Sequence, residues 1–142
     1  MGAQILALLE HPEDVTQVKG CLEVAGYEIC VVSSFAKAKA MLQEHSFALI
    51  ISDVHLENGG SVFDFLRWVR SDRRFRVTPF VLFSLQPNET AKYLADGVRT
   101  AARAMGATKY ICMEKFDPVV LSQEISEVLV DGVPVPNTYD TR

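Results

Sequence analysis

Five short apolar runs constrain the fold of this 142-residue chain more than any other feature. Between them lie stretches in which apolar residues recur at the spacing of a helix. The runs are residues 4–9, 27–32, 47–52, 79–84 and 109–113. They lack the alternation of apolar and polar residues that is typical of a strand with one face in water. Strands of this kind are buried on both faces, as in parallel sheets covered by helices on both sides. The pattern predicts an α/β fold with a doubly wound, five-stranded parallel sheet.

Residues typical of helix ends lie between the apolar runs. Pro12 suits the first turn of a helix, and Gly26 suits the position after its last turn. Ser34 is a typical cap for a second helix, and Asp117 with Pro118 forms a cap and a first helical residue. Helices are expected over residues 11–26, 35–45, 61–72 and 117–130, with a long helical stretch between Ser84 and Gly106.

Length and composition indicate one globular domain without a nucleic-acid or membrane partner. Residues 1–130 hold all the predicted elements, and residues 131–142 are expected to form a tail or a linker stub. The net charge of −4 gives no basic footprint for nucleic acid or an anionic membrane. The locally basic segment at residues 67–76 is interpreted as the solvated face of a helix.

Targeting signals and cysteine usage predict a cytoplasmic protein. No stretch approaches the roughly 20 apolar residues that span a bilayer, and the first residues lack the features of a signal peptide. Cys21, Cys30 and Cys112 are an odd, unclustered set inside apolar segments. We interpret them as buried thiols in a reducing compartment rather than as disulfides or metal ligands.

Polar residues that end the predicted strands are the candidates for chemistry. In open parallel sheets, ligands gather outside the carboxyl ends of the strands. Glu10, Asp53, Ser84 and Lys115 fall at or just after such ends. Two carboxylates could hold a divalent cation through oxygen ligands, and that cation could orient a phosphoryl group. Asp53 would then attack phosphorus and form an acyl phosphate.

Three segments resemble the receiver domain of two-component response regulators. These are ALIISDVHL at residues 48–56, PFVLFSL at 79–85 and GATKYICM at 106–113, and the order of elements resembles the family from residue 4 to about residue 130. The resemblance implies a flavodoxin-like fold with strand order 2-1-3-4-5. It also implies a bacterial signalling protein that is a phosphoacceptor and not an enzyme, beyond slow autophosphatase activity.

The resemblance gives each candidate residue a role. Asp53 is implied as the phosphorylation site, Ser84 as the switch hydroxyl that turns toward the phosphate, and Tyr110 as the aromatic switch. A Mg²⁺ ion would be held by Glu10, Asp53 and the backbone carbonyl of His55. The partners implied are a histidine kinase or phosphotransfer protein and an unknown downstream protein.

Simpler interpretations of these residues stay open. Asp53 could be a structural cap, Glu10 a solvated loop residue, Ser84 a turn former and Tyr110 a packing residue at an edge strand. The histidines His11 and His55 lie near the site in sequence, but histidine is a poor magnesium ligand. We interpret their side chains as exposed loop groups.

Two positions depart from the family pattern at the site itself. Receiver domains end their first strand with an acidic pair, whereas this chain has Leu9-Glu10. We therefore expect weakened magnesium binding. Met113 and Glu114 occupy the places of the lysine and proline that follow the fifth strand in the family. Lys115, two residues later, is the candidate to contact the phosphate if the loop bulges.

A third departure lies between Ser84 and Gly106. The separation of 22 residues between them exceeds the corresponding separation in the family by roughly two helical turns. Residues 86–89 are interpreted as a loop into a helix, and Gly97 is expected to break or bend that helix. The segment indicates either an unusual output surface or a surface insertion without effect.

The sequence thus predicts a phosphorelay receiver domain that signals by protein contact, unless the chain is part of a longer protein. No DNA-binding or catalytic domain fits into the twelve residues after Val130. The first alternative is a degenerate, phosphorylation-independent interaction module, which Leu9 and Met113 favour. The second is an enzyme or cofactor binder on the same fold, against which no strand is followed by a glycine-rich phosphate-binding loop.

Overall fold

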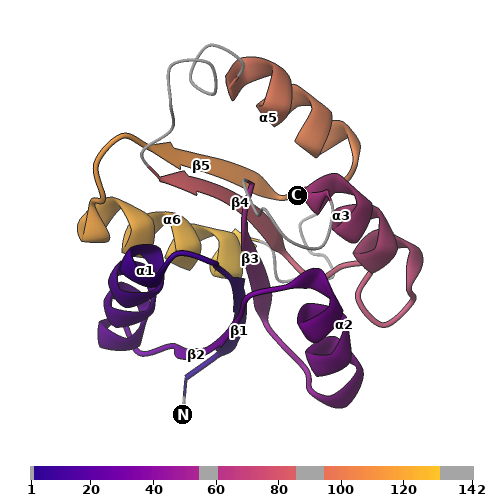
Figure 1. Ribbon diagram of the computed structural model, residues 1–142, viewed down its shortest axis with the longest axis horizontal. Helices are drawn as coiled ribbons and strands as arrows, with labels where there is room; N and C mark the ends of the chain where they lie inside the picture. The colour runs from indigo at the N-terminus through magenta and orange to yellow at the C-terminus, as the bar shows by residue number, and fades with distance from the viewer. Residues whose placement is uncertain (1, 55–60, 86–94, 132–142) are drawn as a thin grey trace.

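The computed structural model describes residues 2–54, 61–85 and 95–131. Its strands are β1 (Gln4–Leu8), β2 (Glu28–Val32), β3 (Leu49–Asp53), β4 (Phe80–Leu85) and β5 (Lys109–Met113). They form one parallel sheet in the order β2-β1-β3-β4-β5 (Figure 1). The predicted α/β class, flavodoxin-like topology and strand order are confirmed.

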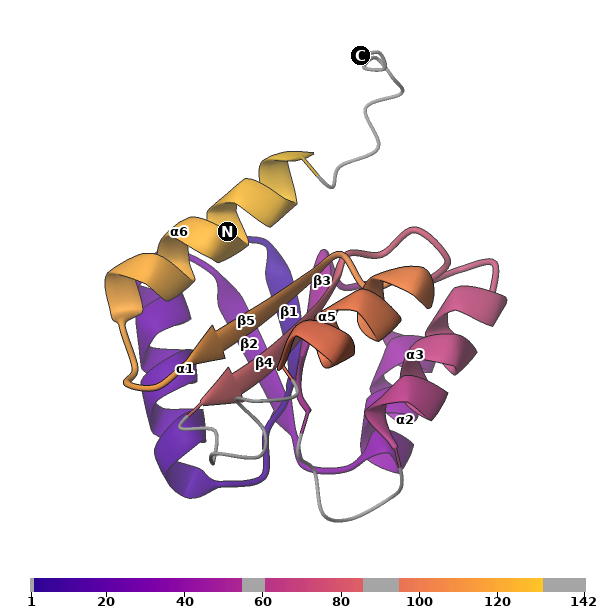
Figure 2. The same ribbon diagram turned by 90° about the horizontal axis from the view of Figure 1, so that it is seen from above.

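Helices cover both faces of the sheet. They are α1 (Pro12–Val24), α2 (Phe35–Glu44), α3 (Val62–Ser71), α5 (Ala95–Ala104) and α6 (Pro118–Asp131). Seen along the sheet, α1 and α6 lie on one side, and α2, α3 and α5 lie on the other (Figure 2). None of the helices in the described ranges is long and apolar enough to cross a membrane.

Alternate residues of the strands feed two separate cores. On the side of α2 and α3, Leu6 and Phe80 pack with Phe65. On the side of α1 and α6, Ile51 and Leu121 belong to the other cluster. Because the central strands are buried on both faces, their sequences are continuous apolar runs rather than alternating ones.

Helix ends follow the predicted signals. Pro12 is the first residue of α1, and Gly26, with φ of +101°, follows its last turn. The Ser34 hydroxyl accepts a hydrogen bond from the Lys37 N–H at 3.2 Å. Asp117 Oδ1 accepts from the N–H groups of Val119 and Val120, at 3.1 and 3.2 Å. These helix starts and stops are confirmed.

Strand bounds differ from the prediction at β3 in a way that matters for the site. Pairing with β1 begins at Leu49, opposite Ile5, so the strand runs to Asp53 rather than ending before it. Asp53 pairs in register with Phe83 of β4. Its carboxylate therefore belongs to the rigid sheet and not to the loop that follows.

The prediction for the segment between Ser84 and Gly106 is confirmed only in part. A helix is present, but α5 spans Ala95–Ala104, and it passes through Gly97, which therefore does not break it. The predicted loop at residues 86–89 lies outside the described residues, as do residues 132–142 of the predicted tail.

Arg70 joins three segments at the amino edge of the sheet. Its Nε donates to the carbonyl of Gly106 at 2.9 Å, and Nη1 donates to the carbonyls of Phe75 and Thr78 at 3.1 and 2.7 Å. Gly106 has φ of +104°. The side chain of Arg70 thus fixes the turn that leads from α5 into β5.

Candidate functional site

Asp53 is the central residue of the candidate site. It closes β3, a central strand between β1 and β4, and is 5% exposed. Its place at the carboxyl edge is the place predicted for it. A buried carboxylate is costly unless nearby groups stabilise its charge, so its neighbours decide what it can do.

The end of β1 contributes one carboxylate and one apolar residue. Glu10 is half-buried and directly follows Leu9, which is 1% exposed and packs into the core on the side of α1 and α6. His55, predicted to supply a backbone carbonyl, lies outside the described residues. Glu10 and Asp53 therefore are the sequence-predicted metal ligands for which the structure gives a position.

Asp14 is a third carboxylate near the site, and it was not among the residues predicted for the site. It lies in the first turn of α1. Burial is the largest cause of its raised pKa, and the charge of Asp53 raises that pKa further, while His11 lowers it. The signal was available, because Asp14 precedes the buried Val18 by four residues and so shares its face of the helix.

The donor set suits magnesium in kind but falls short in number. Carboxylate oxygens are the ligands that Mg²⁺ prefers, and Glu10 and Asp53 supply them. Leu9 supplies none. Within the described ranges no group of three histidine, cysteine or acidic side chains is arranged to hold a metal. The residues present thus fit a cation that keeps water in most of its coordination positions.

Ser84 and Tyr110 lie on the neighbouring strands β4 and β5. Ser84 is fully buried, and among the described residues its Oγ has no hydrogen-bond partner of good geometry. It still lies near enough to Tyr110 to lower the pKa of the phenol. Burial of Tyr110, with Cys112 beside it, outweighs that effect and raises the pKa. The two predicted switch residues are therefore neighbours in space.

Arg99 is a further residue of this group that the sequence did not indicate. Its guanidinium carbon lies 5.3 Å from the centre of the Tyr110 ring, and its charge lowers the pKa of that phenol. It lies on α5, in the segment for which the sequence predicted a long helical stretch without defined ends. No motif marks an arginine at this place.

β5 places no cation near Asp53 at the position where receiver domains have a lysine. Met113 ends β5, is 7% exposed and belongs to the same apolar cluster as Leu9. Lys115 is exposed in the turn beyond it, and no ion pair between described residues includes it. Its contact with a phosphate stays a prediction.

Comparisons with known proteins point to one fold family, although no protein-family model and no curated protein sequence matches the chain. The chemotaxis response regulator CheY4 of Vibrio cholerae superposes with a TM-score of 0.74 at 26% identity, covering 90% of this chain and 99% of that chain. The receiver domain of a signal transduction histidine kinase from Syntrophus aciditrophicus gives 0.75 at 25% identity, covering 94% of both chains.

A third solved structure shows the same fold at lower identity. The receiver domain of the sensor histidine kinase PA1611 from Pseudomonas aeruginosa, which has a magnesium ion in its active-site cleft, superposes with a TM-score of 0.75 at 18% identity, covering 92% of this chain and 99% of that chain. These neighbours and the sheet order agree with the fold that the sequence motifs implied. The chain therefore has the flavodoxin-like fold of response-regulator receiver domains and is a structural relative of that family.

Proposed function

We propose that this chain is a phosphoacceptor receiver domain of a phosphorelay, phosphorylated on Asp53 by a histidine kinase or a phosphotransfer protein. The observation that carries the proposal is the position of Asp53, a buried carboxylate at the end of a central strand. Similarity to receiver domains of response regulators and sensor kinases supports the same role.

The proposed reaction is a phosphoryl transfer between side chains. An Asp53 carboxylate oxygen attacks the phosphorus of a phosphohistidine, the P–N bond breaks, and the imidazole leaves and takes up a proton. Glu10 and Asp53, with the carbonyl of His55, would hold Mg²⁺, as the related PA1611 domain holds a magnesium ion. When bound, the ion would neutralise charge on the transferred group.

The proposed switch begins with the added charge. An acyl phosphate at Asp53 adds roughly two negative charges at neutral pH. The Ser84 hydroxyl, which has no well-formed hydrogen bond among the described residues, is available to donate to a phosphoryl oxygen. Its movement would alter the packing of Tyr110, and with it the surface that α5 and β5 offer to a downstream protein.

We infer that any turnover is limited to slow hydrolysis of the domain's own acyl phosphate.

The three free cysteines fit a reducing compartment, and we place the protein in the cytoplasm for that reason. Lys115 is proposed as the phosphate contact that replaces the absent lysine at Met113.

A second candidate function is a phosphorylation-independent interaction module. Leu9 and Met113 favour it, because a carboxylate and an ammonium are both replaced by apolar side chains that pack in one cluster. Because one negative and one positive charge are lost together, the local net charge is unchanged and the fold stays intact. Binding of the ion and contact with the phosphate are weakened. This candidate keeps the partner surface but loses the switch.

Phosphorylation by a small-molecule donor separates the two candidates. The intact chain is incubated with acetyl phosphate and Mg²⁺, and its mass is followed with and without hydroxylamine, which cleaves acyl phosphates. A gain of one phosphoryl group that hydroxylamine removes, and that Asp53→Asn abolishes, supports the phosphoacceptor. The exposed Asp64→Asn is the matched control and should be modified like the unaltered chain. If neither acetyl phosphate nor a phosphorylated histidine phosphotransfer protein modifies the chain, the interaction module is the function.

A further inference from the structure

Basic residues are concentrated on one part of an otherwise acidic molecule. The helices α2 and α3 and the connection between α3 and β4 carry six basic residues in addition to Arg70, namely Lys37, Lys39, Arg67, Arg73, Arg74 and Arg76. The net charge of the whole chain is nevertheless −4. The acidic excess therefore lies elsewhere, including the first turn of α1 and the ion-pair carboxylates of α6. This separation gives the molecule a basic side.

Two stacked aromatic rings lie between two cations on this basic side. The Lys39 ammonium lies 5.2 Å from the centre of the Trp68 ring. Trp68 stacks on Phe75 with ring centres 5.6 Å apart, and the Arg74 guanidinium carbon lies 4.8 Å from the centre of the Phe75 ring. The row runs from α2 across α3 into the connection beyond it. We call these four residues the basic row.

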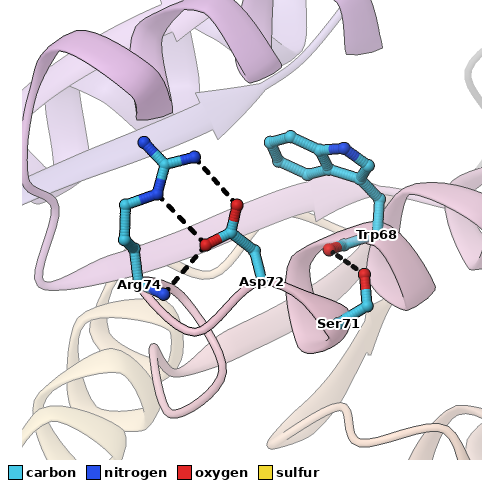
Figure 3. A network of polar contacts seen from close by, with 4 residues as sticks. All are labelled: Trp68, Ser71, Asp72 and Arg74. Atoms are coloured by element: carbon cyan, nitrogen blue, oxygen red, sulfur yellow. Dashed lines mark hydrogen bonds and ion pairs between the residues drawn. The ribbon is translucent and has the colours of Figure 1, made fainter.

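Arg74 already binds a carboxylate in this surface. Asp72 Oδ1 accepts hydrogen bonds from Nε and from the backbone N–H of Arg74, at 3.1 and 2.9 Å, and Oδ2 accepts from Nη2 at 2.8 Å (Figure 3). This bidentate geometry is the one that arginine uses to recognise carboxylates. Arg74 Nη1 donates to no acceptor in the described part of the chain, so the guanidinium can take a second carboxylate.

A hollow of about 310 Å³ adjoins the end of the row. Arg74, Phe75 and Thr78 line one side of it, and residues 42–47 line the other, including Glu44, His45 and Phe47. A volume of this order lies at the lower end of the range of small-ligand pockets, which is room enough for one large side chain. The basic row thus has anion-binding groups beside a partly apolar cavity.

We propose that the basic row binds an acidic segment of a partner protein, with carboxylates on Lys39 and Arg74 and an apolar side chain in the adjoining hollow. Seven of the fourteen lysines and arginines lie on this side, and two of these arginines are already paired, with Asp64 and Asp72. A short acidic peptide matches such a small patch. A nucleic acid would need a longer run of unpaired cations. The surface is separate from Asp53, so binding here is independent of the proposed phosphorylation.

The test uses the full chain and a fluorescein-labelled peptide of aspartate and glutamate residues around one leucine. Fluorescence anisotropy gives the dissociation constant. The emission of Trp68, the sole tryptophan, reports whether the unlabelled peptide reaches the row. We expect micromolar affinity that falls as salt is added, and a change in Trp68 emission. Lys39→Gln with Arg74→Gln should weaken binding about tenfold, whereas Lys19→Gln on α1 should leave it unchanged.

Three results would overturn the proposal. The first is equal binding of a peptide in which every acidic residue is replaced by its amide. The second is unchanged affinity of the doubly substituted chain, once circular dichroism has shown that it is folded. The third is tighter binding of a single- or double-stranded oligonucleotide, which would assign the row to nucleic acid. Phosphorylation of Asp53, measured on the same variants, should be unaffected in every case and so separates this proposal from the preceding one.

Discussion

Arg99 of α5 lies over the ring of Tyr110 of β5, with 5.3 Å between its guanidinium carbon and the ring centre. Tyr110 is 8% exposed and neighbours Ser84, which is fully buried. The carboxyl edge of β4 is therefore connected with the surface of α5 through two contacts. A change at Ser84 has a short route to that surface, which is the arrangement that a switch requires.

Replacing Arg99 by glutamine should raise the pKa of Tyr110 further. Burial already raises that pKa above its usual value near 10, and the cation lowers it in part. Because the folded-state pKa exceeds the unfolded-state value, the protein should lose stability as the pH rises through the range above about 10. Ultraviolet difference titration, with Tyr110→Phe to identify this residue among the four tyrosines, measures the shift. An unchanged titration would show that Arg99 does not act on the phenol.

Replacing Ser84 by alanine should stabilise the unphosphorylated protein slightly. The buried Oγ lacks a well-formed hydrogen bond within the described residues, so removing it eliminates a desolvated polar group worth about 1 kcal/mol. The free energy of unfolding, measured in urea, should rise by up to that amount. The same variant should accept the phosphoryl group on Asp53, but phosphorylation should then no longer alter the packing of Tyr110. A loss of stability instead would mean that the hydroxyl has a structural partner.

Replacing Gly106 by alanine should destabilise the fold, because glycine is needed there twice. Its φ of +104° is unfavourable for other residues, and an added Cβ would lie 3.0 Å from Arg70 Nε. We expect a loss of about 1–2 kcal/mol. Gly20→Ala is the matched control, since Gly20 lies inside α1 with no atom within 4 Å of an added Cβ. That change should stabilise by about 0.5–1 kcal/mol, and thermal unfolding of both variants gives the comparison.

Replacing Asp14 by asparagine should reduce the dependence of stability on pH. Burial and then the charge of Asp53 raise the pKa of Asp14 above 3.8. A raised folded-state pKa means that stability is highest below the unfolded-state value and falls as the pH rises through the folded-state value. Asp14→Asn should therefore remove that decline, which urea unfolding at a series of pH values detects. Glu13→Gln, next to it in the same turn, is the control and should keep most of the decline, because the charge of Glu13 is the smallest of the causes that raise the pKa of Asp14.

The fold could be predicted from the sequence because the signals for each strand and helix lie within that element's own residues. A strand made of a continuous apolar run, such as residues 49–51, is buried on both faces, as in a sheet covered by helices on both sides. Pro12, Ser34 and Asp117 indicate helix starts because proline suits the first helical turn and serine and aspartate side chains cap backbone N–H groups. Contacts between distant segments are different. Arg99 meets Tyr110, and Asp14 approaches Asp53, only because the strand order brings their elements together. Neither pair has a spacing in the chain that would reveal it.

Introducing a carboxylate in place of Leu9 and an ammonium in place of Met113 tests whether the site lost these two charges as a pair. Leu9→Asp alone should cost about 3 kcal/mol, because it places a charge where a leucine is 1% exposed. Met113→Lys alone should cost a similar amount. If both positions border Asp53, the double variant should lose less than the sum, and Mg²⁺ should stabilise the Leu9→Asp chain against urea more than the unaltered chain. Leu9→Asn, which lacks the charge, should show no such gain. Additive losses and equal Mg²⁺ responses would mean that Leu9 does not occupy the position of a lost ligand.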